Sequence, residues 1–355
     1  MRHSGFSSKL TAAIAAISIA WIAGCRSNPG TENVMLSGAG STFVNPVMTR
    51  WTHDFTQAHP NIQINYQSIG SGGGIQQVKA GTVDFGATDA ALSDQQLAEM
   101  KPMIQIPQSA GPVCITYNLP DLKEPLRLSP EALAAIFLGT IKSWQDPAIA
   151  KDNPGVQFPK LPVIVSHRAD GSGTTNIFTT FLSAVSPEWQ SKVGKGSSVS
   201  WPVGLGGKGS EGVTGNIRQS PGAIGYVELT YAEQNHLPVA SIKNQAGEFI
   251  PPTAAATTAA INAFISQLTQ DTRTPIVNPP ASATDAYPIS GLTFLLIPKD
   301  GPGRTRRDAL KRFAQFIMTD GQATAATLNY APLPDGIKQY NQQQLQQMTA
   351  DGQPL

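Results

Sequence analysis

The chain has 355 residues, which at about 150 residues per domain favours two domains over one. Charged residues make up 14% of it and hydrophobic residues 40%, a mixture that can bury a large core and excludes a disordered chain. The 25 Lys and Arg residues balance the 24 Asp and Glu residues, which argues against a nucleic-acid partner bound through bulk charge. Gly and Pro are frequent but follow no period, so collagen-like and repeat architectures are excluded.

The N-terminal segment has the pattern of an export signal. Arg2 and Lys9 precede an apolar run over 10–24 that is too short and too rich in Ala to span a membrane. The run ends at Cys25 in a motif that resembles the bacterial lipobox, in which the cysteine becomes the lipidated first residue. An ordinary signal peptide with an incidental cysteine is the alternative. We predict a signal peptide over 1–24 and a lipidated tether over 25–32 that anchors the exported, periplasmic protein to the membrane.

Helical and strand patterns alternate along the exported chain, which predicts α/β architecture with mainly parallel sheets. An apolar stripe predicts a helix over 46–59, and alternating apolar residues predict a short strand that ends at Asp89. Ser93 and Gln96 form a capping box for the helix that follows them.

Further along the chain, Ser129 and Pro130 open a predicted helix and Gly139 ends it. The pattern then predicts a strand over 163–165, a helix from about Thr174, a strand over 290–297 and a helix over 307–318. Two apolar segments, 111–118 and 287–297, have the character of strands that cross between domains. Cys114, in the first of them, is expected to be a small buried hydrophobe. The Gln-rich stretch 342–347 reads as a solvated terminal helix or a frayed end.

Three loops rich in Gly, Ser and Thr each lead into a helical pattern; they are 37–43, 70–74 (ahead of a helix over 75–80) and 168–175. Unpaired N–H groups at a helix start bind an oxyanion without a cation, and glycine lets the backbone approach the ligand. For any one loop, a glycine-rich turn with an N-cap is the simpler explanation. None is a nucleotide motif: Gly209 follows Lys208 where a phosphate-binding P-loop needs Ser or Thr.

Charged residues at these loops narrow the ligand class. Arg168 could give a bidentate fork to a tetrahedral oxyanion, and Asp170 is placed to hold that fork. Asp89 follows a strand, where ligands bind in α/β sheets. A carboxylate facing an anion requires a ligand that brings its own proton, as phosphate does near neutral pH and sulfate does not. An ordinary surface ion pair and a turn aspartate are the alternatives for these residues.

At these positions the sequence resembles the substrate-binding protein of bacterial ABC phosphate importers. The matching segments are LSGAGSTF (36–43), INYQSIGSGGG (64–74), VDFGATDAALSD (83–94), RADGSGTT (168–175), WPVGLGGKG (201–209) and PGAIGYVE (221–228). They occur in the family's order and span essentially the whole exported chain.

The resemblance implies which residues contact phosphate. They are Thr42 and the backbone of Phe43 in the first loop, Ser71 in the second, Asp89 as acceptor of the phosphate proton, and Arg168, Ser172, Gly173 and Thr174 in the third. Asp170 resembles the family's partner of the binding arginine. Gly72 and His167 depart from the family pattern, which often has serine and arginine at these positions.

The resemblance also implies the two-lobed periplasmic-binding-protein fold of type II-like form, with a mixed sheet flanked by helices in each lobe and the ligand cleft between the lobes. Lobe 1 would comprise 33–117 and 292–355, and lobe 2 would comprise 118–291. The lobes would close over phosphate and present it to the permease subunits of an ABC transporter. It implies no cofactor, metal or nucleic acid, and a monomer once soluble.

Proteins of other classes remain as alternatives. A secreted phosphatase or serine hydrolase is disfavoured because Ser172 is not in a nucleophile elbow and His167 is the one histidine near a candidate loop. No HExxH or clustered metal ligands occur in the sequence. A binding protein for sulfate or molybdate would have no use for Asp89, and a structural surface lipoprotein would leave the three loops unexplained.

Overall fold

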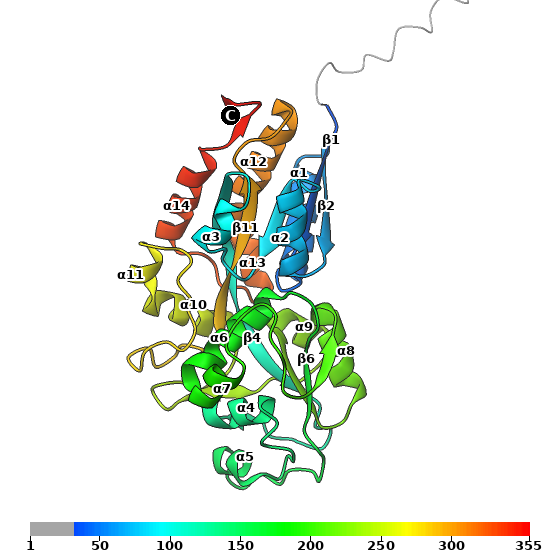
Figure 1. Cartoon of the computed structure of the whole chain (residues 1–355), viewed down its shortest axis with the longest axis vertical. Helices are drawn as coiled ribbons and strands as arrows, with labels where there is room; N and C mark the ends of the chain where they lie inside the picture. Colours follow the sequence, from blue (N-terminus) through cyan, green and yellow to red (C-terminus); the bar gives the residue numbers. More distant parts are fainter. Residues whose placement is uncertain (1–31) are drawn as a thin grey trace, which may run out of the picture. The chain divides into compact units, whose positions relative to one another are not determined.

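The structure, a computed structural model, describes residues 32–355, so the predicted signal peptide and Cys25 lie outside the described residues. Val34–Leu355 forms one compact unit (Figure 1). None of the helices in the described range has the length and apolar character needed to cross a membrane.

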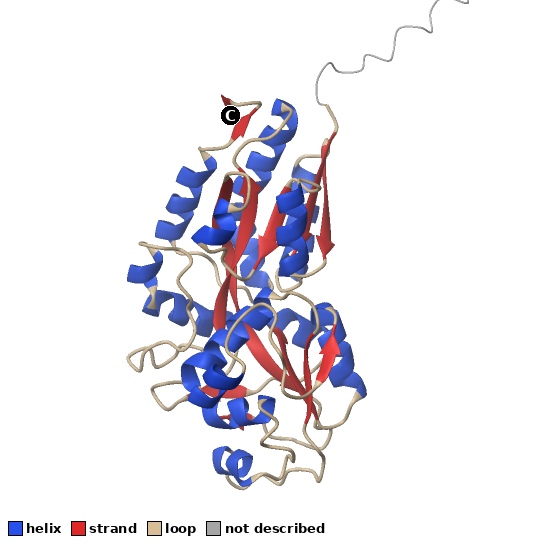
Figure 2. Cartoon of the chain, viewed as in Figure 1, coloured by secondary structure: helices blue, strands red, loops and turns tan. Residues whose placement is uncertain are grey.

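The main sheet has eight strands in the order β2-β1-β3-β11-β4-β8-β6-β7. Figure 2 shows strands in red and helices in blue beside them. Its strands are β1 (Val34–Gly40), β2 (Ile62–Ser68), β3 (Phe85–Thr88), β4 (Met103–Tyr117), β6 (Ile164–Arg168), β7 (Leu205–Gly207), β8 (Ala223–Glu228) and β11 (Ser290–Pro298). A small three-stranded sheet contains β5 (Arg127–Leu128), β9 (Ser241–Lys243) and β10 (Phe249–Ile250). A two-stranded sheet contains β12 (Thr349–Ala350) and β13 (Gln353–Pro354).

Strand direction changes in the middle of the main sheet. β1 runs parallel to β2 and β3, and β6 runs parallel to β7 and β8, as predicted. The two predicted crossover strands are β4 and β11, and they run antiparallel to each other and to their outer neighbours. β4 pairs with β11 up to Pro112 and with β8 from Val113 onward. A single strand therefore belongs to both halves of the sheet.

The helices are α1 (Asn45–Ala58), α2 (Ser71–Ala80), α3 (Asp94–Ala98), α4 (Pro130–Phe137), α5 (Pro147–Asp152), α6 (Gly173–Val185), α7 (Pro187–Lys192), α8 (Gly209–Gln219), α9 (Leu229–Gln234), α10 (Ala254–Ala263), α11 (Ile265–Leu268), α12 (Arg304–Met318), α13 (Asp320–Thr327) and α14 (Asp335–Leu345). The capping box of Ser93 and Gln96 and the N-cap of Ser129 are confirmed.

One helix start was predicted wrongly. The second glycine-rich loop is already helical, because α2 begins at Ser71 and not at Ile75. Tertiary contacts override the weak helix preference of glycine there. The Gln-rich stretch 342–347, predicted as a solvated terminal helix or a frayed end, runs through the end of α14, with Leu345 buried and most of its glutamines exposed.

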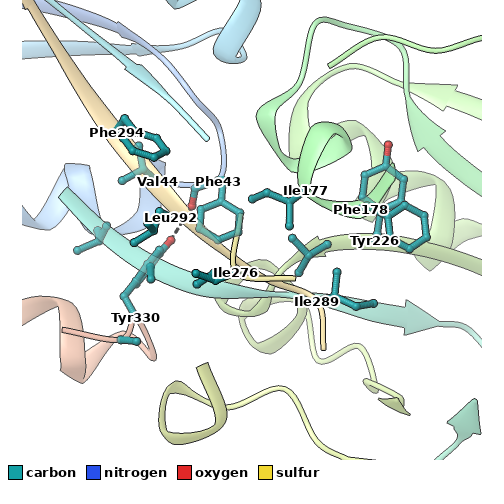
Figure 3. Close-up of a cluster of buried hydrophobic side chains, with 14 of the residues drawn as sticks. Phe43, Val44, Ile177, Phe178, Tyr226, Ile276, Ile289, Leu292, Phe294 and Tyr330 are labelled. Atoms are coloured by element: carbon teal, nitrogen blue, oxygen red, sulfur yellow. Dashed lines mark hydrogen bonds between the residues drawn. The ribbon is translucent and has the colours of Figure 1, made fainter. Parts of the chain in front are cut away.

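The main hydrophobic core runs through both halves of the sheet. In Figure 3 buried side chains continue from Phe294 and Leu292 past Phe43 and Ile177 to Phe178 on α6. Gly291 on β11 gives room to α6, because a Cβ there would lie 2.2 Å from Ile177. Strand β11 thus packs closely against α6, the helix that follows the third predicted loop.

Cys114 is fully buried in β4, and its thiol donates to the Val227 carbonyl oxygen on β8 at 3.3 Å. Burial raises the pKa of this thiol well above its ordinary value. Its prediction as a small buried hydrophobe is confirmed.

Candidate anion-binding site

Residues 41–43 of the first predicted loop, the second predicted loop and Asp89 follow three neighbouring strands, β1, β2 and β3. Residues 37–40, predicted as part of the first loop, belong to β1. These strands are parallel, so their carboxyl ends lie at one edge of the sheet. The N–H of Ser41 donates to the Ala87 carbonyl oxygen at 2.9 Å, and the N–H of Gly70 donates to that of Gly40 at 2.9 Å. The three loops that begin there are therefore held side by side by main-chain hydrogen bonds.

Tyrosines hold the first loop. Three successive carbonyl oxygens each accept a hydrogen bond from a tyrosine hydroxyl: Ser41 from Tyr66 at 2.9 Å, Thr42 from Tyr231 at 2.7 Å and Phe43 from Tyr330 at 2.6 Å (Figure 3 shows the last). A trans peptide directs its N–H opposite to its C=O. The first two bonds therefore turn the N–H groups of Thr42 and Phe43 away from the tyrosines.

Glycines allow the second loop to approach its neighbours. A Cβ on Gly74 would lie 2.4 Å from the Cα of Gly40, so only glycine fits there. The N–H of Gly72 donates to the Gly171 carbonyl oxygen at 2.8 Å, which joins the second loop to the third. A Cβ on Gly72 would lie 3.1 Å from the Cα of Gly171, so glycine, the departure from the family pattern, suits this close contact.

Arg168 ends β6 and is buried, with its guanidinium bound to Asp170 on both sides. Nε donates to Oδ1 at 2.8 Å and a terminal nitrogen donates to Oδ2 at 2.5 Å. The N–H of Gly209 also donates to Oδ1, at 3.0 Å. Burial alone would raise the pKa of Asp170, but the hydrogen bonds and charge of Arg168 outweigh it and lower that pKa. Asp170 therefore stays ionised and holds the guanidinium in one orientation.

The third loop ends in the start of α6. Ser172 is the N-cap, and its hydroxyl accepts from the Thr175 N–H at 3.1 Å. The amides of Gly173 and Thr174 lie in the same first turn, where no acceptor within the helix exists. A Cβ on Gly173 would lie 2.6 Å from both the Asp89 nitrogen and the Ser71 Oγ. The start of α6 thus contacts the loops that follow β2 and β3.

Asp89 lies at the centre of these contacts and is 4% exposed. Its Oδ1 accepts from the Ser41 hydroxyl at 2.5 Å, its Oδ2 from the Thr174 hydroxyl at 3.4 Å, and its N–H donates to Ser71 Oγ at 3.2 Å. Burial raises the pKa of Asp89 to about 6, although the hydrogen bond from Ser41 and the charge of Arg168 act in the opposite direction. Near pH 7 the carboxylate is therefore mostly ionised.

A further helix start, that of α8, contacts the first loop. The Ser210 N–H donates to the Thr42 Oγ1 at 3.2 Å, and the two hydroxyl oxygens lie 2.9 Å apart. The hydroxyl oxygen of Thr42 therefore accepts from the Ser210 N–H, and the two hydroxyls share a further hydrogen bond in which either can donate.

The structure brings the predicted site residues together, although their roles toward a ligand stay a prediction. The buried ones are Thr42, Phe43, Ser71, Asp89, Arg168, Ser172, Gly173 and Thr174, with Asp170 half-buried beside them. Sequence reasoning missed Ser41, Ser210 and the three tyrosines. Ser41 directly precedes Thr42, so its place in a predicted loop was the available signal; the others come from distant parts of the chain.

Ser172 and His167, which a hydrolase would use as nucleophile and base, both make structural contacts. The hydroxyl of Ser172 caps α6, and His167 stacks on Trp201 with its Nδ1 3.0 Å from the Arg168 carbonyl oxygen. Among residues 32–355, no three His, Cys, Asp or Glu side chains gather in a way that could hold a metal ion.

Comparison with known proteins identifies the class. The profile of the PBP superfamily domain matches residues 27–321, so the chain belongs to the PBP superfamily. More narrowly, it belongs to the PstS phosphate-binding protein family. It is 43% identical over 309 residues to the phosphate-binding protein PstS of Xylella fastidiosa (strain Temecula1), covering 86% of this chain and 84% of the relative. It is 40% identical over 328 residues to PstS of Pasteurella multocida, covering 92% and 94%.

Solved structures agree on the fold. A high-affinity periplasmic phosphate-binding protein, PfluDING, has a TM-score of 0.68 at 23% identity, covering 86% of this chain and 92% of its own. A human phosphate-binding apolipoprotein has a TM-score of 0.69 at 21% identity, covering 86% and 93%. The family resemblance and the α/β class of the periplasmic-binding-protein fold are confirmed.

Proposed function

We propose that the protein binds inorganic phosphate outside the cytoplasmic membrane and delivers it to an ABC-type phosphate permease. The relatives named phosphate-binding protein PstS support the ligand class. The observation that carries the proposal is one site in which a buried guanidinium, a buried carboxylate and two helix starts meet, those of α2 and α6. This combination suits an anion that carries a proton.

Each predicted ligand residue has a role in this proposal. The N–H groups of Thr42, Phe43, Gly173 and Thr174 and the hydroxyls of Thr42, Ser71, Ser172 and Thr174 donate to phosphate oxygens. Arg168 supplies the charge, oriented by Asp170. Asp89 accepts the phosphate proton.

Selectivity against sulfate or molybdate follows from Asp89. Fully ionised sulfate would set oxygen lone pairs against the carboxylate of Asp89 in a buried site. Sites that leave a buried polar group unpaired by the wrong ligand reject it by roughly 10⁴–10⁵-fold.

The two lobes, 33–117 with 292–355 and 118–291, would open and close about β4 and β11. The change of partner within β4 supports this division. The bonds between Thr42 and Ser210 and between Gly72 and Gly171 would form on closure. A permease would then distinguish the closed form.

We propose binding without catalysis, and a monomer once soluble. Ser172 and His167 make structural contacts that explain their presence without a role as nucleophile and base. A phosphatase or serine hydrolase would turn over a phosphomonoester or an ester, whereas the proposed binding protein turns over neither.

The location follows from the N-terminal sequence. Signal cleavage before Cys25 and its lipidation would hold the periplasmic protein at the membrane through a tether over 25–32. Cys25→Ser should release the protein from membranes or block its processing. Equal membrane partition of this variant and the parent would exclude the lipid anchor.

Isothermal calorimetry tests the ligand. The purified domain from residue 33 onward is titrated with phosphate, arsenate, sulfate and molybdate, and incubated in parallel with a chromogenic phosphomonoester and a chromogenic carboxylic ester. We expect tight phosphate binding, much weaker sulfate and molybdate binding, and no turnover. Tighter binding of sulfate or molybdate, or release of the chromophore from either ester, would overturn the proposal.

A further inference from the structure

Ser41 lies beside Asp89 because of the register of two strands. β1 and β3 are parallel with Gly40 opposite Ala87, so the residues that follow them leave the sheet together. The Ser41 N–H donates to the Ala87 carbonyl oxygen at 2.9 Å, which extends the ladder by one bond. The Ser41 side chain then faces the carboxylate of Asp89, 48 positions along the chain.

The hydroxyl of Ser41 donates its proton to Asp89 and accepts a hydrogen bond from the backbone. A serine hydroxyl has one proton and accepting lone pairs. The Val44 N–H donates to Ser41 Oγ at 3.4 Å, which uses a lone pair, and the proton points to Asp89 Oδ1 across 2.5 Å. Ser41 is fully buried, so water does not compete. The tyrosine hydroxyl of Tyr66, bound to the Ser41 carbonyl oxygen at 2.9 Å, fixes the backbone at this position.

The hydroxyls of Ser41, Thr174 and Thr293 act on this carboxylate, and that of Ser41 lies 2.5 Å from Oδ1. Thr174 lies at 3.4 Å and comes from α6, so its contact depends on the approach of α6. The bond from Ser41 joins two loops of the same sheet edge and does not depend on α6. The bond therefore needs no approach of α6 to form.

Other charged and titratable groups also face Asp89. Arg168 on β6 favours its ionised form, Tyr66 on β2 interacts with it electrostatically, and Arg273 lines the same cavity of about 50 Å³. Arg273 is bound to Asp271 at 2.8 Å and to Asp94. Burial raises the pKa of Asp89, and the groups that act against burial are, largest first, the hydroxyls of Ser41 and Thr293, the charge of Arg168 and the hydroxyl of Thr174.

We propose that Ser41 is a positioning residue that holds Asp89 as an ionised, fixed acceptor and thereby sets the pH down to which the site selects phosphate over sulfate. This proposal rests on the proposed function, because it deepens the role of Asp89 there. Protonated Asp89 becomes a donor, and a donor at this place suits sulfate. Without the Ser41 hydroxyl, protonation and the loss of selectivity occur at higher pH.

Two measurements on Ser41→Ala test the proposal. The first is an NMR titration of the Asp89 carboxyl carbon in the ligand-free protein, which gives the pH midpoint of its ionisation. The second is calorimetry from about pH 4.5 to about pH 8, which gives the pH midpoint at which the phosphate-to-sulfate affinity ratio falls. We expect both midpoints to rise by about one pH unit, because a charge-assisted hydrogen bond to the carboxylate is lost. The ionisation of free phosphate is the same for both proteins, so it cancels from their comparison.

Ser37→Ala is the matched control. Ser37 lies on β1, the strand that Ser41 follows, and its hydroxyl donates to Asp84 at 3.0 Å, outside the site. It should leave both midpoints at the parent values. Ser41→Thr keeps a hydroxyl, and where it folds it should restore the parent midpoints.

The outcomes separate the two proposals. A parent that binds no phosphate would defeat the proposed function, while the NMR titration would still test the bond to Asp89. A parent that selects phosphate, with Ser41→Ala midpoints equal to its own, would overturn the role of Ser41. A loss of phosphate affinity that is equal at every pH would also overturn it, because it would make Ser41 a direct ligand.

Discussion

The hydroxyl of Tyr231 lies 2.7 Å from the main-chain carbonyl oxygen of Thr42, although the two residues are 189 positions apart. Tyr231 stands on α9, in the predicted second lobe, and Thr42 belongs to the first loop of the site. The same hydroxyl lies 3.0 Å from Glu211 Oε1 on α8. One tyrosine thus connects the loop that would hold the ligand with two helices of the other lobe.

Tyr231→Phe should therefore weaken phosphate binding. The variant keeps the ring and removes the bond that directs the Phe43 N–H, and one neutral hydrogen bond is worth about 0.5–1.5 kcal/mol, or roughly two- to tenfold in affinity. Calorimetry on both proteins measures it. Tyr340→Phe, on α14, serves as the control and should bind as the parent does. Parental affinity in Tyr231→Phe would show that the loop keeps its direction without this bond.

Arg168→Ala should lower phosphate affinity at least tenfold, because each charge-assisted bond is worth about 1.5–3 kcal/mol. Arg168→Lys keeps the charge without the fork and should fall between this variant and the parent. Arg50→Ala, which removes an exposed arginine paired with Asp54, is the control. Thermal unfolding confirms that each variant is folded. A folded Arg168→Ala with the parent's affinity would remove Arg168 from the site.

Asp89→Asn should keep measurable phosphate binding while the phosphate-to-sulfate affinity ratio falls sharply. The amide preserves the shape and offers a donor that sulfate accepts. Calorimetry with both anions decides it. Asp84→Asn, at a carboxylate that also accepts from a serine but lies outside the site, should leave the ratio unchanged. If Asp89→Asn also leaves it unchanged, selectivity arises elsewhere.

Gly173→Ala should abolish tight binding without unfolding the chain. The new methyl group would lie 2.6 Å from the Asp89 nitrogen and from Ser71 Oγ, so α6 could not approach the loops after β2 and β3. Gly215→Ala on α8 is the matched control, because its Cβ would meet no atom within 4 Å. That variant should bind normally and gain up to about 1 kcal/mol of stability from helix propensity. Equal phosphate affinity in both variants would refute this geometry.

Glu228 should make the unfolding free energy depend on pH. It is fully buried beside Thr230, and burial raises its pKa from 4.5 to about 8. Between these values the folded state binds more protons than the unfolded state, so stability falls as the pH rises, by at most about 1.4 kcal/mol per unit. Glu228→Gln should remove that slope. Urea unfolding from about pH 5 to about pH 8.5 measures it, and parallel curves for the two proteins would contradict the assignment.

Sequence alone could predict the site where the signal is local. Asp89 follows an alternating strand, and Arg168 and Ser172 stand in a glycine-rich run before a helical pattern, so short stretches carried the information. The loops meet because parallel strands end at one edge, which is a general property of such sheets.

What could not be predicted depends on contacts between distant residues. The helix at Gly72 and Gly74 contradicts glycine's weak helix propensity, and close packing against Gly171 and Gly40 explains it. The antiparallel direction of β4 and β11 has no signature in an apolar run. Tyr231 reaches Thr42 only through the folded arrangement of α9.

The burial of Cys114 has a practical consequence for any version of the protein that starts after Cys25. Such a chain carries one thiol, on β4, bound to the Val227 carbonyl oxygen and buried in a cluster with Val213 and Ile217 of α8 and Leu229 of α9. A thiol reagent can reach it only when this cluster opens, so its labelling rate records that opening. Any ligand that binds the folded form alone should slow the reaction. The reactivity of Cys114 therefore reports how often the folded state opens, and no label has to be introduced to measure it.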